Sequence, residues 1–157
     1  MSLTPARCLI LACGNTLRRD DGVGLWLADW AEQRFSGKAD LRVIADHQWT
    51  PELADDVAHA QSVLFIDCSI EALPGSVKLR PVEPAAGGRV LGTHHQSAAE
   101  LLALGRELYA SLPLKSFLLT IGASSVELGE GFSEPVEAAL PEACRLLEET
   151  VQRMLTD

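Results

Sequence analysis

Residues 7–24 read RCLILACGNTLRRDDGVG and contain the signals that decide the fold. The run over 7–12 is almost entirely apolar, and Gly-Asn at 14–15 ends it, which is typical of a strand buried on both faces of a sheet. A polar loop over 16–20 separates this strand from apolar residues that recur at helical spacing over 23–31. We therefore expect a central β-strand followed by a turn and an α-helix.

The rest of the chain continues this alternation of strands and helices. Further strands are expected over 41–45, 62–67, 76–80 and 117–121, and further helices over 51–60, 98–109 and 134–154. Asp20 is the expected N-cap of the first helix and Ser97 that of the third. The alternation predicts an α/β fold with a mostly parallel sheet covered on both faces, and the short strand at 76–80 is expected as an antiparallel edge. One domain, 1–157, is expected.

Composition narrows the classes of partner. The chain has 157 residues, of which 47% are hydrophobic and 22% charged, as is usual for one compact domain with a substantial core. Its formal net charge is -9 and its pI is near 4.8, whereas nucleic-acid binders need a concentrated positive footprint. The tight basic pair Arg18-Arg19 is followed directly by two aspartates. We therefore expect neither nucleic acid nor an acidic membrane surface as a partner.

The N-terminal stretch and the cysteines bear on the cellular compartment. The apolar run at 8–13 is too short for the core of a signal peptide or for a membrane-spanning helix. Cys8, Cys13, Cys68 and Cys144 show no CxxC spacing, and buried reduced thiols behave as small hydrophobic groups. We expect a protein of the reducing cytoplasm without membrane insertion.

Three candidate metal ligands stand at positions that this topology would bring together. Asp21 follows the first strand, Asp67 ends the third, and His95 precedes a helix. Ligands of such sheets bind beyond the carboxyl ends of the strands. Two carboxylates and an imidazole suit Ni, Zn or Fe, and the lack of a cysteine cluster favours an open, exchangeable site.

Structural interpretations of the same residues stay open. Asp20 and Asp21 also fit a helix N-terminus, where the helix dipole favours an ionised Asp21 in the first turn. An aspartate after a strand, such as Asp67, often only caps a turn. His94 and His95 are adjacent and would point in different directions, so the pattern alone does not choose between them. The other two histidines, His47 and His59, are interpreted as surface residues.

Other catalytic motifs are missing from the sequence. The glycines over 14–24 do not have dinucleotide-binding spacing, and no GxxxxGK[ST] occurs. No GxSxG elbow occurs, and Ser69 and Ser97 lack a recognisable base with its orienting partner. Cys13 and Cys68 flank the proposed site, but we interpret them as packing residues.

Taken together, these segments resemble the [NiFe]-hydrogenase maturation endopeptidases. The stretch GNTLRRDDGVG at 14–24 is similar to the opening motif of that family, which is quite specific. The similarity continues through LFID at 64–67, THHQ at 93–96, LTIG at 119–122 and LGEGFS at 128–133. It covers nearly the whole chain.

The resemblance implies a fold, a substrate and a site. It implies a three-layer αβα sandwich around a five-stranded sheet. It also implies an endopeptidase that removes the C-terminal extension of a [NiFe]-hydrogenase large-subunit precursor after nickel insertion. The family's catalytic and metal-recognising site maps onto Asp21, Asp67 and His95. His95 is chosen over His94 because the polar start of a helix follows it. The nickel is expected to be carried by the precursor, and no organic cofactor is expected.

One site residue departs from the family pattern, and two other functions are compatible with the sequence. Asp21 stands where many relatives carry Glu, which shortens the arm of this ligand. A non-catalytic, nickel-sensing, chaperone-like partner would use the same three side chains but leave the precursor uncut. An unrelated small α/β hydrolase would cleave simple peptides without any hydrogenase.

Overall fold

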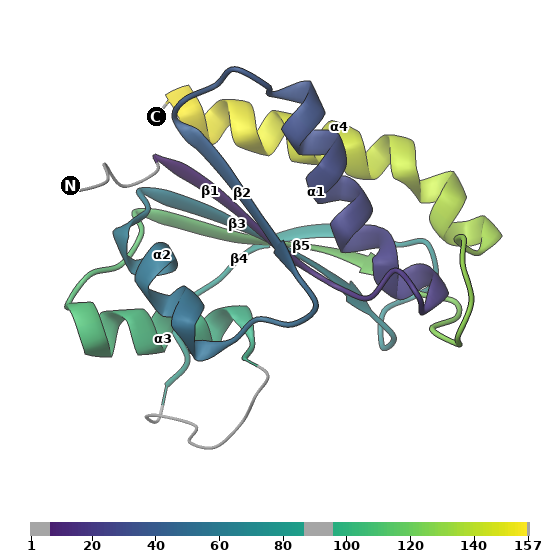
Figure 1. Cartoon of the computed structure of the whole chain (residues 1–157), viewed down its shortest axis with the longest axis horizontal. Helices are drawn as coiled ribbons and strands as arrows, with labels where there is room; N and C mark the ends of the chain where they lie inside the picture. Colours follow the sequence, from purple (N-terminus) through teal and green to yellow (C-terminus); the bar gives the residue numbers. More distant parts are fainter. Residues whose placement is uncertain (1–6, 87–95, 157) are drawn as a thin grey trace.

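The computed structural model describes residues 7–86 and 96–156, and a five-stranded sheet forms its centre (Figure 1). The strands are β1 (Cys8–Cys13), β2 (Leu41–Asp46), β3 (Ser62–Ser69), β4 (Val77–Pro81) and β5 (Lys115–Gly122). They lie in the order β2-β1-β3-β5-β4. All neighbouring pairs are parallel except β4 and β5, which are antiparallel. The expected mostly parallel sheet with an antiparallel edge strand is confirmed.

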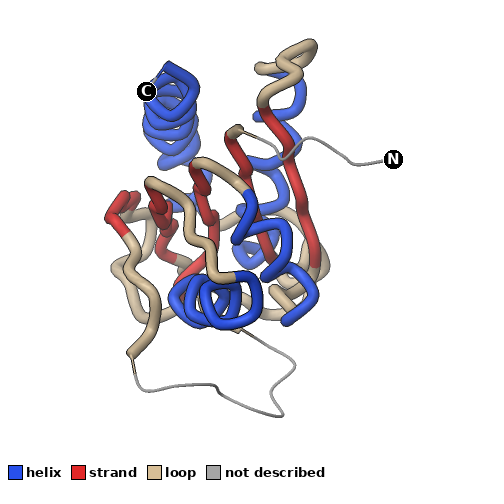
Figure 2. Tube along the Cα trace, turned by 90° about the vertical axis from the view of Figure 1, so that its left-hand side faces the viewer, coloured by secondary structure: helices blue, strands red, loops and turns tan. Residues whose placement is uncertain are grey.

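Helices cover both faces of this sheet. They are α1 (Val23–Arg34), α2 (Ala54–His59), α3 (Ala98–Tyr109) and α4 (Glu134–Thr156), with short 3-10 helices η1 (Arg19–Gly22) and η2 (Pro51–Leu53). α1 and α4 lie on one face, and α2 and α3 lie on the other (Figures 1 and 2). The three-layer αβα sandwich is therefore confirmed. Within the described residues, no helix is both long enough and apolar enough to cross a membrane.

The strand β1 is buried along its whole length because both faces of the sheet are covered. Its even-numbered residues belong to the core beneath α1 and α4, and its odd-numbered residues belong to the core beneath α2 and α3. This is the two-residue period of a strand that serves two layers at once. Burial of each large apolar side chain stabilises the fold by about 1.5–3 kcal/mol.

Gly24 allows α1 to lie directly on the sheet. A Cβ atom at this position would be 2.5 Å from the carbonyl oxygen of Cys13 and 3.4 Å from that of Ile66. A side chain here would therefore collide with the backbone of β1. This close approach fixes the beginning of α1 against the carboxyl ends of β1 and β3.

The prediction for the third helix start is confirmed. The hydroxyl of Ser97 accepts a hydrogen bond from the backbone N–H of Glu100 at 3.1 Å, and the Glu100 carboxylate accepts one from the N–H of Ser97 at 3.0 Å. This reciprocal capping box begins α3.

The prediction that Asp20 caps the first helix is wrong. α1 begins at Val23, and its N-cap is Gly22, which provides no side-chain hydrogen bond. Asp20 and Asp21 lie before it, in η1. Asp20 is fully buried because its carboxylate binds backbone and hydroxyl donors from distant segments. Asp21 is therefore not in the first turn of α1, and the helix-dipole argument for its ionisation does not apply.

Candidate functional site

The order of the strands changes direction where β1 and β3 lie side by side. β2 follows β1 in the chain but lies on one side of it, whereas β3 lies on the other side. Such a switch point is where open α/β sheets bind their ligands, beyond the carboxyl ends of the strands. Asp21 follows β1 in η1, and Asp67 lies near the carboxyl end of β3. The fold thus brings two of the three predicted site residues to the same edge of the sheet.

Asp67 is held by its neighbours on the two central strands. Its Oδ1 accepts a hydrogen bond from the backbone N–H of Cys68 at 2.7 Å and another from the thiol of Cys13 at 3.3 Å. β3 continues past Asp67 to Ser69, so this aspartate lies within a strand and not in the turn that follows. The alternative that Asp67 only caps a turn is therefore wrong.

Asp21 is held against the loop that leaves β1. Its Oδ2 accepts a hydrogen bond from the backbone N–H of Asn15 at 2.9 Å, and the side chain of Asn15 in turn accepts one from the N–H of Leu17 at 2.9 Å. A Cβ atom at Gly14 would be 2.1 Å from the carbonyl oxygen of Asp21. The glycine is therefore needed for this close return of the chain, which places Asp21 beside the end of β1.

The two thiols nearest these carboxylates remain protonated at neutral pH. Burial, followed by the charge of Asp67 and its hydrogen bond, raises the pKa of Cys13 far above its ordinary value. Burial and the carboxylates of Asp21, Asp67 and Asp20 raise the pKa of Cys68 to about 12. Neither thiol is therefore an activated nucleophile. Cys13 packs as expected, but it also donates a hydrogen bond to Asp67, which the sequence pattern did not indicate.

Asp20 is the buried anchor of this edge. Its Oδ2 accepts hydrogen bonds from the backbone N–H groups of Ser124 and Ser125, at 2.8 and 3.0 Å, and from the hydroxyl of Ser133 at 2.7 Å. Its Oδ1 accepts one from the N–H of Ser133 at 2.7 Å. Burial alone would raise the pKa of Asp20, but these hydrogen bonds, Ser133 first, lower it below its ordinary value. Asp20 is therefore ionised in the folded protein.

Asp20 joins η1 to the segment between β5 and α4. Backbone bonds strengthen the same junction, because the N–H of Asp20 donates to Ser125 at 3.1 Å and the N–H of Arg19 donates to Gly129 at 3.0 Å. Asp21 is the next residue, so its position depends on this junction. No local sequence pattern could reveal it, since the partners of Asp20 lie 104 to 113 residues further along the chain.

The third predicted site residue, His95, lies outside the described residues, as does His94. The next residue, Gln96, is buried, and its N–H donates to the carbonyl of Trp49 at 2.9 Å. Trp49 packs edge to face on Phe65, with ring centroids 5.3 Å apart. Gln96 is therefore fixed beside the segment that follows β2.

The remaining histidines are exposed as predicted. His47 and His59 both lie on the surface, and His59 faces Asp55 one helical turn away. Among the described residues, no group of three or more His, Cys, Asp or Glu is arranged to hold a metal ion. Of the three predicted site residues, the structure therefore describes Asp21 and Asp67.

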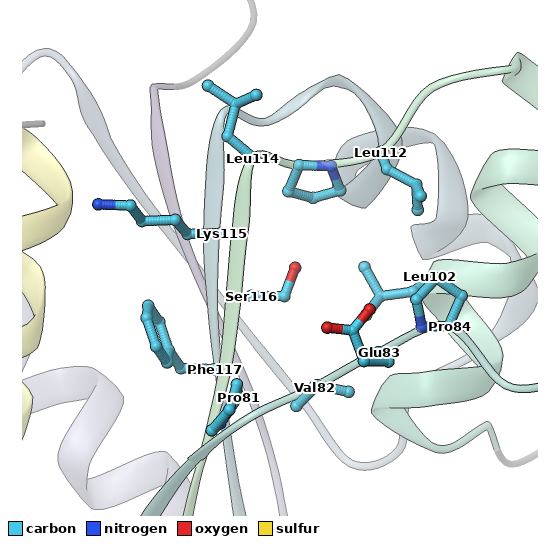
Figure 3. A pocket seen from close by; sticks show the side chains of 11 residues that line it. Pro81, Val82, Glu83, Pro84, Leu102, Leu112, Leu114, Lys115, Ser116 and Phe117 are labelled. Atoms are coloured by element: carbon cyan, nitrogen blue, oxygen red, sulfur yellow. The ribbon is translucent and has the colours of Figure 1, made fainter.

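The pocket in Figure 3 lies at the beginning of β5, and the carboxylates of Asp21 and Asp67 do not line it. It has a volume of about 240 Å³ and is lined by the beginning of β5 and by the residues around Glu83. Lys115 in this pocket pairs with Ser62, five residues before Asp67 on β3. Lys115 is therefore about 16 Å from Asp67 along the strand direction. We do not place the candidate site there.

No protein-family model matches the sequence, and no curated protein is significantly similar to it. Solved structures are similar over almost the whole chain. The hydrogenase maturating endopeptidase HybD from E. coli is 24% identical, covers 94% of this chain and 93% of its own, and has a TM-score of 0.78. The hydrogenase 2 maturation peptidase from a Thaumarchaeota archaeon is 27% identical over 93% of this chain and 98% of its own, with a TM-score of 0.66.

A third similar structure is the [NiFe] hydrogenase maturation protease HycI from Thermococcus kodakarensis. It is 22% identical over 97% of this chain and 94% of its own, with a TM-score of 0.66. The resemblance predicted from the sequence motifs is thus confirmed by the structure, and the chain has the fold of the [NiFe]-hydrogenase maturation proteases.

Proposed function

We propose that this protein is an endopeptidase that removes the C-terminal extension of a [NiFe]-hydrogenase large-subunit precursor after nickel has been inserted. The observation that carries the proposal is that Asp21 and Asp67 lie at the same edge of the sheet, at its switch point, in a fold shared with hydrogenase maturation proteases. The substrate is a protein, and the nickel is its cargo. No organic cofactor is needed for peptide hydrolysis.

The chemistry of the two carboxylates supports recognition of a divalent cation. Asp21 and Asp67 both raise the pKa of the Cys68 thiol, so their negative charges act on one small region. A cation bound there would offset their mutual repulsion. Their carboxylate oxygens are donors that suit a borderline metal in an open site.

His95 is proposed as the third ligand. The support for this assignment is the placement of Gln96, which is buried and bound to Trp49 at the segment following β2. β2 is the direct neighbour of β1, so this segment begins at the edge of the sheet at which Asp21 and Asp67 lie. An imidazole with two carboxylates would complete the coordination of nickel carried by the precursor.

Recognition of nickel would act as a checkpoint for cleavage. A precursor that carries nickel would be held by Asp21, Asp67 and His95 with its scissile peptide in a fixed position, whereas a nickel-free precursor would lack this contact. Correct positioning supplies a large part of the rate enhancement of many enzymes. The binding energy of the correct substrate would thus assemble the productive complex.

Two routes for hydrolysis are compatible with these residues. In the first, Asp21 or Asp67 takes a proton from a water molecule, the hydroxide attacks the scissile carbonyl, and the proton passes to the amine of the leaving peptide. In the second, the site only docks nickel, and strain in the precursor backbone assists the attack of water. Single-turnover rates against pH distinguish them, because only the first requires a carboxylate-like titration.

We also place the protein in the cytoplasm. All four cysteines are free, and a reducing compartment is where unpaired thiols persist. Fractionation of cells followed by detection of the protein tests this placement, and recovery from an oxidising compartment would contradict it.

The test of the proposed function is the mass of the substrate. The purified protein is incubated with a nickel-loaded large-subunit precursor, and the mass and C-terminus of the product are determined. An endopeptidase produces a shortened large subunit and a released peptide. A stable complex without a new C-terminus would instead support the chaperone-like alternative, and turnover of simple peptides alone would support an unrelated hydrolase.

A further inference from the structure

A groove of about 410 Å³ begins at the loop that carries Asp21 and follows the first turns of α1. Arg19 and Gly22 form its end nearest the candidate site, and Asp29 lies at the other end. Leu25, Trp26 and Phe132 provide its apolar lining. The groove thus lies against η1, the turn that also carries Asp21.

Trp26 is the exposed aromatic side chain of this lining, and Phe132 beside it is partly buried. Trp26 is 39% exposed and meets Phe132 edge to face, with ring centroids 6.4 Å apart and an interplanar angle of 82°. Leu17 and Leu128 are not part of the lining but are also exposed, by 60% and 75%, on two loops joined by the hydrogen bond from Gly129 N–H to the Leu17 carbonyl. Exposed aromatic groups surrounded by apolar residues are typical of the energetic centres of protein interfaces.

Arg19 contributes a positively charged side chain to the lining of the groove. Its Nε is buried and has no hydrogen-bond partner among the described residues. Its backbone has a φ of 46°, which is the left-handed region, and the bond from its N–H to the carbonyl of Gly129 holds it there. The loop thus fixes the backbone of Arg19, and its positively charged side chain lines the groove beside residues 16 and 22.

The dimensions of the groove suit an extended peptide. From Val23 to Asp29 the helix α1 rises by about 9 Å, which corresponds to roughly three residues of extended chain. The volume is in the range of small ligand sites and not of interfaces between folded domains. The positive group at one end and the carboxylate of Asp29 at the other define a direction along α1.

We propose that this groove binds the segment of the precursor next to the scissile bond as an extended chain. In this arrangement, which rests on the proposed function, an apolar side chain of the substrate packs against Trp26 and Phe132. A carbonyl oxygen of the same segment accepts a hydrogen bond from the guanidinium group of Arg19. The groove therefore sets which sequence beside the cleavage site is accepted, while Asp21 and Asp67 respond to nickel.

The test compares binding and cleavage of a nickel-loaded large-subunit precursor by the wild type, Trp26→Ala and Trp26→Phe. Trp26→Ala is expected to raise KM and the dissociation constant about tenfold while kcat changes less than about threefold, because it removes binding made equally before and during the reaction. Trp26→Phe is expected to recover most of the loss. The matched control is Leu114→Ala, since Leu114 is 85% exposed at the opposite edge of the sheet.

Arg19→Gln is the second variant, and it is expected to weaken binding of the same precursor. Its melting temperature is expected to stay within a few degrees of that of the wild type. If the wild type cleaves the precursor, and both Trp26→Ala and Arg19→Gln leave KM and the dissociation constant unchanged, the groove is overturned and the proposed function stays intact. If the wild type binds the precursor without cleaving it, and Trp26→Ala weakens that binding, the proposed function is overturned but the groove is supported. Absence of both binding and cleavage by the wild type would overturn both.

Discussion

Two adjacent aspartates in η1 have opposite roles. Asp20 has no exposed surface, and its carboxylate accepts four hydrogen bonds from Ser124, Ser125 and Ser133. Asp21 is only partly buried, and its carboxylate accepts a hydrogen bond from the backbone N–H of Asn15. The first residue therefore holds the loop together, and the second is left at the edge of the sheet, where a ligand can reach it.

Replacement of Asp20 by Asn should destabilise the fold. The amide group would present N–H donors to the serine N–H groups, so that hydrogen bonds to a charged acceptor are lost within a buried environment. We expect a loss of about 2–4 kcal/mol in the free energy of unfolding, measured by urea denaturation. Asp40→Asn, on the surface, is the control, and equal stability of the two variants would contradict the anchoring role.

The contribution of Asp20 should depend on pH. Because its pKa is lowered in the folded protein, its stabilisation is present above the ordinary aspartate pKa of about 3.9 and is lost as the pH falls through the lowered value. The difference in unfolding free energy between wild type and Asp20→Asn should be constant from about pH 5 to 7 and decrease in acid. A difference that grows on acidification would contradict this sign.

Asp21→Asn and Asp67→Asn should affect processing much more than stability. Each substitution keeps the shape of the side chain but removes the charge that we assign to nickel recognition and water activation. We expect single-turnover processing to fall by at least about a hundredfold with melting temperatures within a few degrees of the wild type. Normal processing by either variant would exclude that residue from the site.

At the scale of elements, contact between α1 and the sheet positions the site. Gly24→Ala places a methyl group 2.5 Å from the carbonyl oxygen of Cys13 and should cost about 2–4 kcal/mol, despite the higher helix propensity of Ala. Gly105 belongs to α3 and faces α2, and the nearest atoms to a Cβ added there lie at 3.1 Å. Gly105→Ala should therefore change stability by less than about 1 kcal/mol. Unfolding measurements that reverse this order would contradict the packing account.

The elements that the sequence predicted well are those governed by local signals. Ser97 and Glu100 stand three residues apart and form the capping box of α3, and the apolar run of β1 is buried on both faces. β3 extends two residues beyond its expected end because Cys68 and Ser69 pair with β5, a contact that no local pattern contains. η1 was missed for the same reason, since its geometry depends on donors from the segment before α4.

At the scale of the whole molecule, topology accounts for what could be predicted of the site. The expected parallel sheet placed the ends of β1 and β3 side by side, and Asp21 and Asp67 do lie at that edge. The hydrogen bond from Cys13 to Asp67 and the unpaired donor of Arg19 could not be predicted. They depend on side-chain packing between segments that the chain brings together only on folding.

The central claim is that Asp21 and Asp67 make cleavage depend on nickel in the substrate. The most direct measurement compares nickel-loaded and nickel-free large-subunit precursor, each incubated with the wild-type protein, by the mass and C-terminus of the product over time. We predict that only the loaded precursor is shortened. Shortening of both precursors at the same rate, or of neither, would contradict the account.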